Sequence, residues 1–255
     1  MELPKDCTAL QEGYNEGYKY CRMYWPDMNE ELLENVETHE MQLNHLNGHG
    51  IPGNGLRKAQ RDYSKEDSRG IKVLDNPRYT QEYINAGIAG ERALFRLIKN
   101  SRLYATAEVF FSVAYPEPSQ YEYADVDCII VSGSIMYLID AKMYRVNPNA
   151  TYSTPVNNQI HLSDNSGHLL RTYPVSLSML HAREAFQKAY PKYDVQSVIA
   201  LCPTSNGNPA VYKQSCLYGC IPLVQAKGFI SAFRRRDTRP PVGDSYKSLY
   251  DLLIP

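Results

Sequence analysis

The sequence predicts an α/β fold in which helices flank a mixed central sheet, preceded by an N-terminal helical extension. Two segments, 80–99 and 174–190, carry apolar residues at helical spacing. Apolar runs at 107–114, 128–139 and 195–202 have the composition of buried strands. The order of helix, three strands, helix and strand is typical of a sheet covered by helices.

The extension and the rest of the chain differ in character. Residues 1–45 have apolar side chains at helical spacing, and acidic residues outnumber Lys and Arg there. We expect this segment to be a helical cap, an oligomerisation arm or a partner surface rather than a phosphate site. Residues 45–55 have a loop composition, and 56–76 are mixed and charged, as in a linker. The predicted domains are therefore a helical N-terminal extension with linker at 1–76 and one globular domain at 77–255.

Composition and charge limit the setting. The formal net charge is −1, so no global field attracts nucleic acid or a membrane. The start lacks a leader pattern, and no apolar run approaches the roughly 18 residues of a membrane span. We therefore expect a cytoplasmic protein with no membrane partner and with reduced thiols. Cys216 and Cys220 have a zinc-like spacing, but no clear second ligand pair accompanies them.

The segment 80–99 (T-Q-E-Y-I-N-A-G-I-A-G-E-R-A-L-F-R-L-I-K) predicts a helix with a broad apolar stripe. Gly87 and Gly90 weaken a helix, which close packing on a sheet would explain. Glu91 lies beside the apolar stripe. Its carboxylate either extends to solvent, as Glu normally does, or reaches into a site.

The segment 123–145 (Y-A-D-V-D-C-I-I-V-S-G-S-I-M-Y-L-I-D-A-K-M-Y-R) predicts a β-hairpin. If Gly133 and Ser134 form a type II′ turn, Asp127 lies opposite Asp140. The same register places Asp125 opposite Lys142, and alternation then puts all four of these charged side chains on one face.

Carboxylates directly across a strand pair repel each other, and unpaired charge in an apolar core is costly. A divalent cation would compensate, because Mg²⁺ is held by one or two carboxylates with waters and phosphates. A buried Asp–Lys ion pair that stabilises the sheet is the alternative, since structural ion pairs also occupy such positions.

The second half completes the predicted sheet. Residues 147–167 have the composition of a long loop, and Pro174 is expected at the start of the helix 174–190. A short strand at 220–224 and a helix at 227–236 follow the strand 195–202. That last helix ends in the basic residues Arg234, Arg235 and Arg236. They could contact phosphate, with Arg145 beside the hairpin, or simply be favoured at a helix C-terminus.

Three motifs in this order resemble the restriction-endonuclease-like PD-(D/E)XK nuclease superfamily and, more narrowly, the nuclease-related domain (NERD) family. They are A-G-I-A-G-E-R-A-L on the first helix, V-D-C-I-I-V-S-G-S on the second strand and M-Y-L-I-D-A-K on the third. The resemblance covers about residues 83–224 and implies a restriction-endonuclease-like core. It assigns the catalytic set Glu91, Asp127, Asp140 and Lys142, and leaves Asp125 as an extra carboxylate.

The resemblance implies a metal-dependent nuclease that hydrolyses phosphodiester bonds, with DNA as the expected substrate. Asp127, Asp140, Glu91 and the Ala141 carbonyl would hold Mg²⁺ or Mn²⁺, while Lys142 would orient the attacking water. One alternative is a catalytically weak protein of the same fold that binds nucleic acid or a protein partner. Two others are a structural or partner-binding protein organised by the N-terminal helices, and an unrelated enzyme with paired carboxylates, such as a glycosidase.

Overall fold

A computed structural model describes the chain at 48–63, 81–101, 103, 106–116, 125–144, 146–154, 159–174, 178–212, 221–235 and 239–255. The helices expected within 1–45 and the charged linker after residue 63 lie outside the described residues. So do Arg145, Arg236, Cys216 and Cys220, and nothing is described of the Arg234 and Arg235 side chains.

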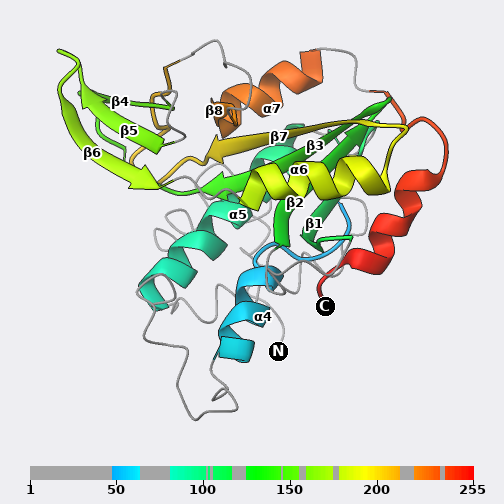
Figure 1. The fold of residues 1–255 in the computed structure, drawn as a ribbon. Helices are drawn as coiled ribbons and strands as arrows, with labels where there is room; N and C mark the ends of the chain where they lie inside the picture. Colours follow the sequence, from blue (N-terminus) through cyan, green and yellow to red (C-terminus); the bar gives the residue numbers. More distant parts are fainter. Residues whose placement is uncertain are drawn as a thin grey trace, which may run out of the picture.

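A five-stranded mixed sheet forms the centre of the molecule (Figure 1). Its spatial order is β1-β2-β3-β7-β8; the first three strands are antiparallel, and β3, β7 and β8 are parallel. The strands span Glu108–Ala114, Asp125–Ser132, Ile135–Lys142, Asp194–Leu201 and Leu223–Gln225, respectively. The sequence prediction of a mixed sheet flanked by helices is confirmed.

Helices cover both faces of this sheet and create two apolar layers. Helix α5 (Gln81–Ser101) and helix α7 (Ala226–Arg235) pack on one face, where Leu94, Phe95 and Ile230 are buried. Helix α6 (Ser178–Ala189) packs on the other face through Met179, Ala182 and Phe186. The 3-10 helix η5 (Ser245–Leu252), which the sequence did not indicate, joins the second layer. None of the described helices is long and apolar enough to cross a membrane.

The hairpin follows the predicted register. Ser132 pairs with Ile135, and the ladder continues to Cys128 opposite Ile139. Gly133 has a φ of +58°, the sign that a type II′ turn requires at its first central position. The recorded pairs end at Cys128 and Ile139, so the predicted pairings of Asp127 with Asp140 and of Asp125 with Lys142 stay predictions.

The predicted long loop 147–167 is wrong, because a second, three-stranded antiparallel sheet occupies this region (Figure 1). It consists of β4 (Ala150–Ser153), β5 (Gln159–Asp164) and β6 (Leu169–Pro174). Each strand contributes few inward apolar residues in a polar background, so composition alone resembled a loop. Pro174 ends β6, and α6 begins later than predicted, at Ser178.

The stretch predicted as loop and linker also contains a helix, α4 (Asn54–Tyr63). Just before it, His49 pairs with β1: its N–H donates to the Val109 carbonyl and its carbonyl accepts from Phe111, both at 2.8 Å. A Cβ at Gly87 would lie 2.5 Å from Leu56 Cδ1, so Gly87 lets α5 approach α4 rather than the sheet. Residues 48–63 thus pack directly on the core, although they belong to the predicted extension.

Candidate active site

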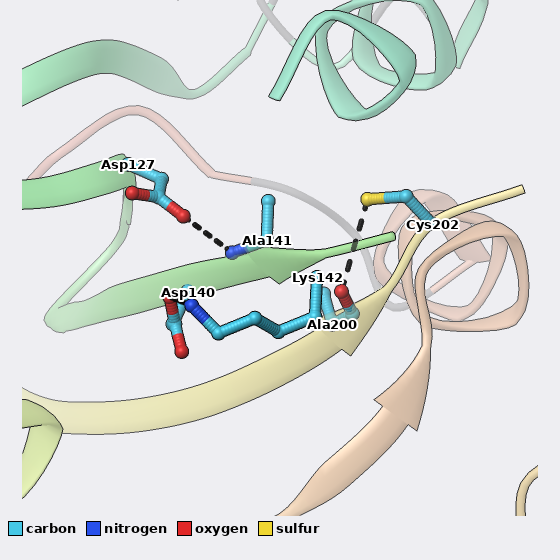
Figure 2. Close-up of polar contacts among 6 residues, drawn as sticks. All are labelled: Asp127, Asp140, Ala141, Lys142, Ala200 and Cys202. Carbon is cyan, nitrogen blue, oxygen red and sulfur yellow. Dashed lines mark hydrogen bonds and ion pairs between the residues drawn. The ribbon is translucent and has the colours of Figure 1, made fainter. Parts of the chain in front are cut away.

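The site begins where β2 and β3 separate. The Ala141 N–H donates a 2.6 Å hydrogen bond to Asp127 Oδ2, in place of a backbone carbonyl across the ladder (Figure 2). Asp127 is therefore held by the backbone of the strand that carries Asp140 and Lys142. A hydrogen bond to an ionised carboxylate is among the stronger hydrogen bonds in proteins.

Side-chain alternation breaks at this point. Val126 packs in the layer below α6, whereas Cys128 packs in the layer below α5, although residues two apart normally share a face. On β1, the neighbouring pairs place Ser112 opposite Asp127, and Ser112 has a positive φ of 52°. This uncommon backbone conformation coincides with the change of face.

The predicted single face for the four charged residues is consequently wrong in part. In Figure 2, Asp127 lies on one side of β3, and Asp140 and Lys142 lie on the other. The carboxylate of Asp127 feels Glu91 of α5 more strongly than it feels Asp140. The acids therefore approach the end of β3 from two directions, which a regular hairpin could not provide.

Asp140 and Lys142 form an ion pair, with 2.6 Å between Lys142 Nζ and Asp140 Oδ1. Burial alone would lower the pKa of Lys142, but Asp140 and then Asp127 more than offset it, so the pKa lies above its ordinary value. The lysine side chain keeps 37% of its surface exposed, against 12% for Asp140. Lys142 is thus protonated, and its ammonium group is held against Asp140.

Glu91 resolves the choice that the sequence left open, because it is only 1% exposed and does not extend to solvent. Its Oε2 accepts a 2.6 Å hydrogen bond from the Gly53 N–H, and its buried Oε1 has no partner among the described residues. Burial, followed by repulsion from Asp125, raises the pKa of Glu91 to about 8. At neutral pH this carboxyl group is largely protonated when no cation is near.

Asp125 joins Glu91 in this acidic cluster. Burial and the charge of Asp140 raise the pKa of Asp125 to about 6, and its buried Oδ2 has no hydrogen-bond partner in the described part of the chain. Its carboxylate lies so close to Gly55 of α4 that a Cβ there would overlap it. The pKa of Asp127 is also raised well above its usual range, by burial and then by Glu91. The carboxyl groups of Glu91, Asp125 and Asp127 therefore lie close together without enough positive charge nearby to balance them.

The carboxyl oxygens of this acidic cluster suit a hard cation, although only a few of them could act as ligands. Within the described ranges, no group of three or more His, Cys, Asp and Glu side chains is arranged to hold a metal ion. Mg²⁺, however, commonly uses one or two carboxylates and completes its shell with water and phosphate. Glu91 Oε1 and Asp125 Oδ2 are buried without a hydrogen-bond partner among the described residues, and the neighbouring acids repel one another. These carboxyl oxygens have the ligand chemistry that such an ion requires.

The cysteines beside the site do not extend this ligand set. Cys128 and Cys202 are fully buried, and burial raises the pKa of both thiols. The Cys202 thiol donates to the Ala200 carbonyl at 3.7 Å (Figure 2). Both therefore act as neutral packing groups.

Sequence reasoning missed Gly53, just before α4, which contacts Glu91, and Gly55 of α4, which contacts Asp125. Their only signal was the glycine-rich run G-H-G-I-P-G-N-G, which indicates a special backbone but not its distant contact. The predicted nucleic-acid contacts at Arg145 and Arg234–Arg236 stay predictions, since their side chains lie outside what the structure describes.

A separate groove lies at the other end of β3, beyond the Gly133 turn. It has a volume of about 780 Å³ and is lined by Tyr137, Phe229 and Phe233, among others. Tyr137 lies edge-on to both phenylalanines, with ring centroids 5.7 and 5.1 Å away. None of the acids of the candidate site lines this groove.

No protein-family model, curated protein or solved structure matches this chain.

Proposed function

We propose that this protein is a metal-dependent nuclease that hydrolyses phosphodiester bonds, with DNA as the expected substrate. The observation that carries the proposal is the group of acids Glu91, Asp127 and Asp140, two of them buried, near a protonated Lys142 at the end of a hairpin. Together with the helix and strand order, this group supports assigning the fold to the restriction-endonuclease-like core. The nuclease-related domain family is the proposed relationship.

Asp127 and Asp140 would hold Mg²⁺ or Mn²⁺, with the Ala141 carbonyl as a further ligand and Glu91 nearby. When bound, the ion supplies Lewis-acid polarisation of the phosphate and lowers the pKa of a coordinated water. The Ala141 carbonyl lies 3.8 Å from the position that a Cβ at Gly90 would take. The absence of a side chain at Gly90 therefore keeps the approach to this oxygen open.

Lys142 has the properties needed to act on the phosphate. It is protonated, it is 37% exposed, and Asp140 holds its ammonium group at 2.6 Å. A positive charge fixed in advance stabilises the negative charge that develops on phosphorus oxygens as the bond breaks. Lys142 would orient the attacking water and offset that charge.

A second candidate function is nucleic-acid or protein binding by a nuclease fold with little catalytic activity. One observation favours it: Lys142 already neutralises Asp140, and the described residues contain no ready-made cluster of three metal-ligating side chains. In this case the ion pair would be structural and the fold would serve recognition.

Cleavage of supercoiled plasmid by the full chain separates the two. We expect nicking or linearisation in Mg²⁺ or Mn²⁺, none in EDTA, and a loss of at least about 100-fold in Asp140→Ala and Lys142→Ala, as for other electrostatic groups in active sites. Asp194→Asn, an exposed carboxylate at the start of β7, is the matched control and should retain full activity. If plasmid, linear DNA, single strands and RNA all stay intact with either metal, the nuclease proposal is wrong.

A further inference from the structure

A column of aromatic side chains leads away from the candidate site into the small sheet. Tyr144 follows Lys142 by two residues and stacks on Tyr173 of β6, with ring centroids 4.4 Å apart and planes at 17°. Tyr152 of β4 also stacks on Tyr144, with ring centroids 5.6 Å apart, and its side chain hydrogen-bonds to Tyr173. The small sheet is thereby fixed to the chain that leaves β3.

Arg171 forms the outer end of this column. Its guanidinium carbon lies 4.9 Å from the centre of the Tyr173 ring, an arrangement that favours a cation over an aromatic face. Arg171 is exposed and pairs across the sheet with Leu162. No carboxylate lies within ion-pair distance of Arg171 in the part of the chain that the structure describes. Its position is thus set by packing, while its charge stays available.

The column couples Arg171 to the acidic site. Burial raises the pKa of Tyr144 to about 12, and its hydroxyl also feels Lys142, Asp140 and Arg171. Tyr144 thus lies within electrostatic reach of both Lys142 and Arg171.

We propose that Arg171, held by Tyr173 and Tyr144, binds a backbone phosphate of the nucleic acid on one side of the cleaved bond. This inference rests on the proposed function and deepens it, because it assigns a substrate-positioning residue outside the acidic cluster. The acids repel a polyanion, and a further cation besides Lys142 would help to hold the strand in place. An arginine is suited to this role because its planar guanidinium matches phosphate oxygens and stacks on aromatic rings.

The test is binding of a fluorescein-labelled DNA strand and duplex to the full chain in EDTA, measured by anisotropy at several NaCl concentrations. Arg171→Ala should raise Kd about 5- to 10-fold at low salt and reduce the slope of log Kd against log salt by about 1, as expected for one lost phosphate contact. Arg171→Lys should retain the slope, since it keeps the charge, but bind less tightly than wild type.

Arg239→Ala is the matched control. Arg239 is exposed and lies at the opposite end of β3, where its carbonyl accepts from the Gly133 N–H. If the nucleic acid contacts only the Arg171 end of β3, the Arg239→Ala variant should keep both Kd and the salt slope within about twofold of wild type. Equal effects of Arg171→Ala and Arg239→Ala, or no effect of Arg171→Ala, overturn the inference.

Plasmid cleavage by the same preparations distinguishes this inference from the proposed function. Cleavage by wild type with unchanged DNA affinity in Arg171→Ala would remove the Arg171 contact and leave the nuclease proposal standing. Absence of cleavage with the expected loss of affinity would support the phosphate contact and contradict hydrolysis. If wild type binds neither strand nor duplex, the Arg171 contact is contradicted.

Discussion

Glu91 illustrates how its surroundings decide what a single carboxyl group does. On a helical wheel it borders the apolar stripe of α5, where a glutamate ordinarily extends to water. In the fold it is enclosed, bound by the Gly53 N–H and placed beside Asp125. Its pKa of about 8, against an ordinary value of 4.5, gives the protein a pH dependence that can be measured.

The first prediction concerns that pH dependence in EDTA. Between about pH 4.5 and 8 the folded protein holds a proton on Glu91 that the unfolded chain has lost, so the folded state binds more protons. Stability therefore falls as the pH rises through this interval. Asp125 adds the same trend between its ordinary 3.8 and about 6. Glu91→Gln should have a Tm that declines less from pH 5 to 8.

Glu184→Gln is the control, because the Glu184 side chain is 74% exposed. It should decline with pH as wild type does. Parallel Tm curves for wild type and Glu91→Gln over this range would show that Glu91 does not carry a raised pKa.

At the scale of elements, α4 is tied to the sheet through a glycine. Gly55 lies in the helix against the Asp125 carboxylate of β2, and a Cβ there would overlap it. Gly55→Ala should therefore destabilise the fold by about 1–3 kcal/mol, the usual cost of overpacking, despite the better helix propensity of Ala. Urea unfolding measures the difference.

Gly228 of α7 is the matched helical glycine. A Cβ there would meet only Gln225 Oε1, at an ordinary 3.6 Å. Gly228→Ala should stabilise the protein by about 0.5–1 kcal/mol. Similar changes in the free energy of unfolding for the two variants would contradict the close approach of α4 to Asp125.

Sequence patterns predicted the elements whose formation depends on residues close together in the chain. Alternating apolar runs around Gly133 gave the hairpin and its register, and helical spacing gave α5 and α7. The small sheet was not predicted because its strands are short and mostly polar. Its tyrosines, Tyr152 and Tyr173, pack on Tyr144 and on each other, although they are far apart in the sequence. Helix α4 was not predicted because its sequence has few apolar residues besides Leu56 to indicate an apolar face.

The candidate site was predictable as a list of residues and less so as an arrangement. The hairpin register singled out Asp125, Asp127, Asp140 and Lys142, and the family resemblance added Glu91. The ion pair of Asp140 with Lys142 is present in the fold. The change of face at Asp127 could not be predicted, since it coincides with a positive φ at Ser112 that no sequence pattern marks. The contacts from Gly53 and Gly55 join segments far apart in the chain.

At the scale of the whole molecule, the grouped acids lower the stability of the fold. Glu91 comes from α5, Asp125 and Asp127 from β2, Asp140 from β3, and α4 closes the cluster. Burial, followed by repulsion from the neighbouring acids, raises the pKa values of Glu91, Asp125 and Asp127. Carboxyl groups with perturbed pKa values are characteristic of functional sites, where a bound ion or substrate can supply the opposite charge.

The most direct measurement is calorimetric titration of Mg²⁺ and Mn²⁺ into the full chain and into Asp127→Asn and Asp140→Asn, with Asp194→Asn as the control. Wild type and Asp194→Asn should bind the ions, and each site variant should lose at least about 10-fold in affinity because a carboxylate ligand is replaced by a neutral amide. Affinities unchanged in both site variants, or no binding to wild type at millimolar metal, would contradict a cation site at the end of the hairpin.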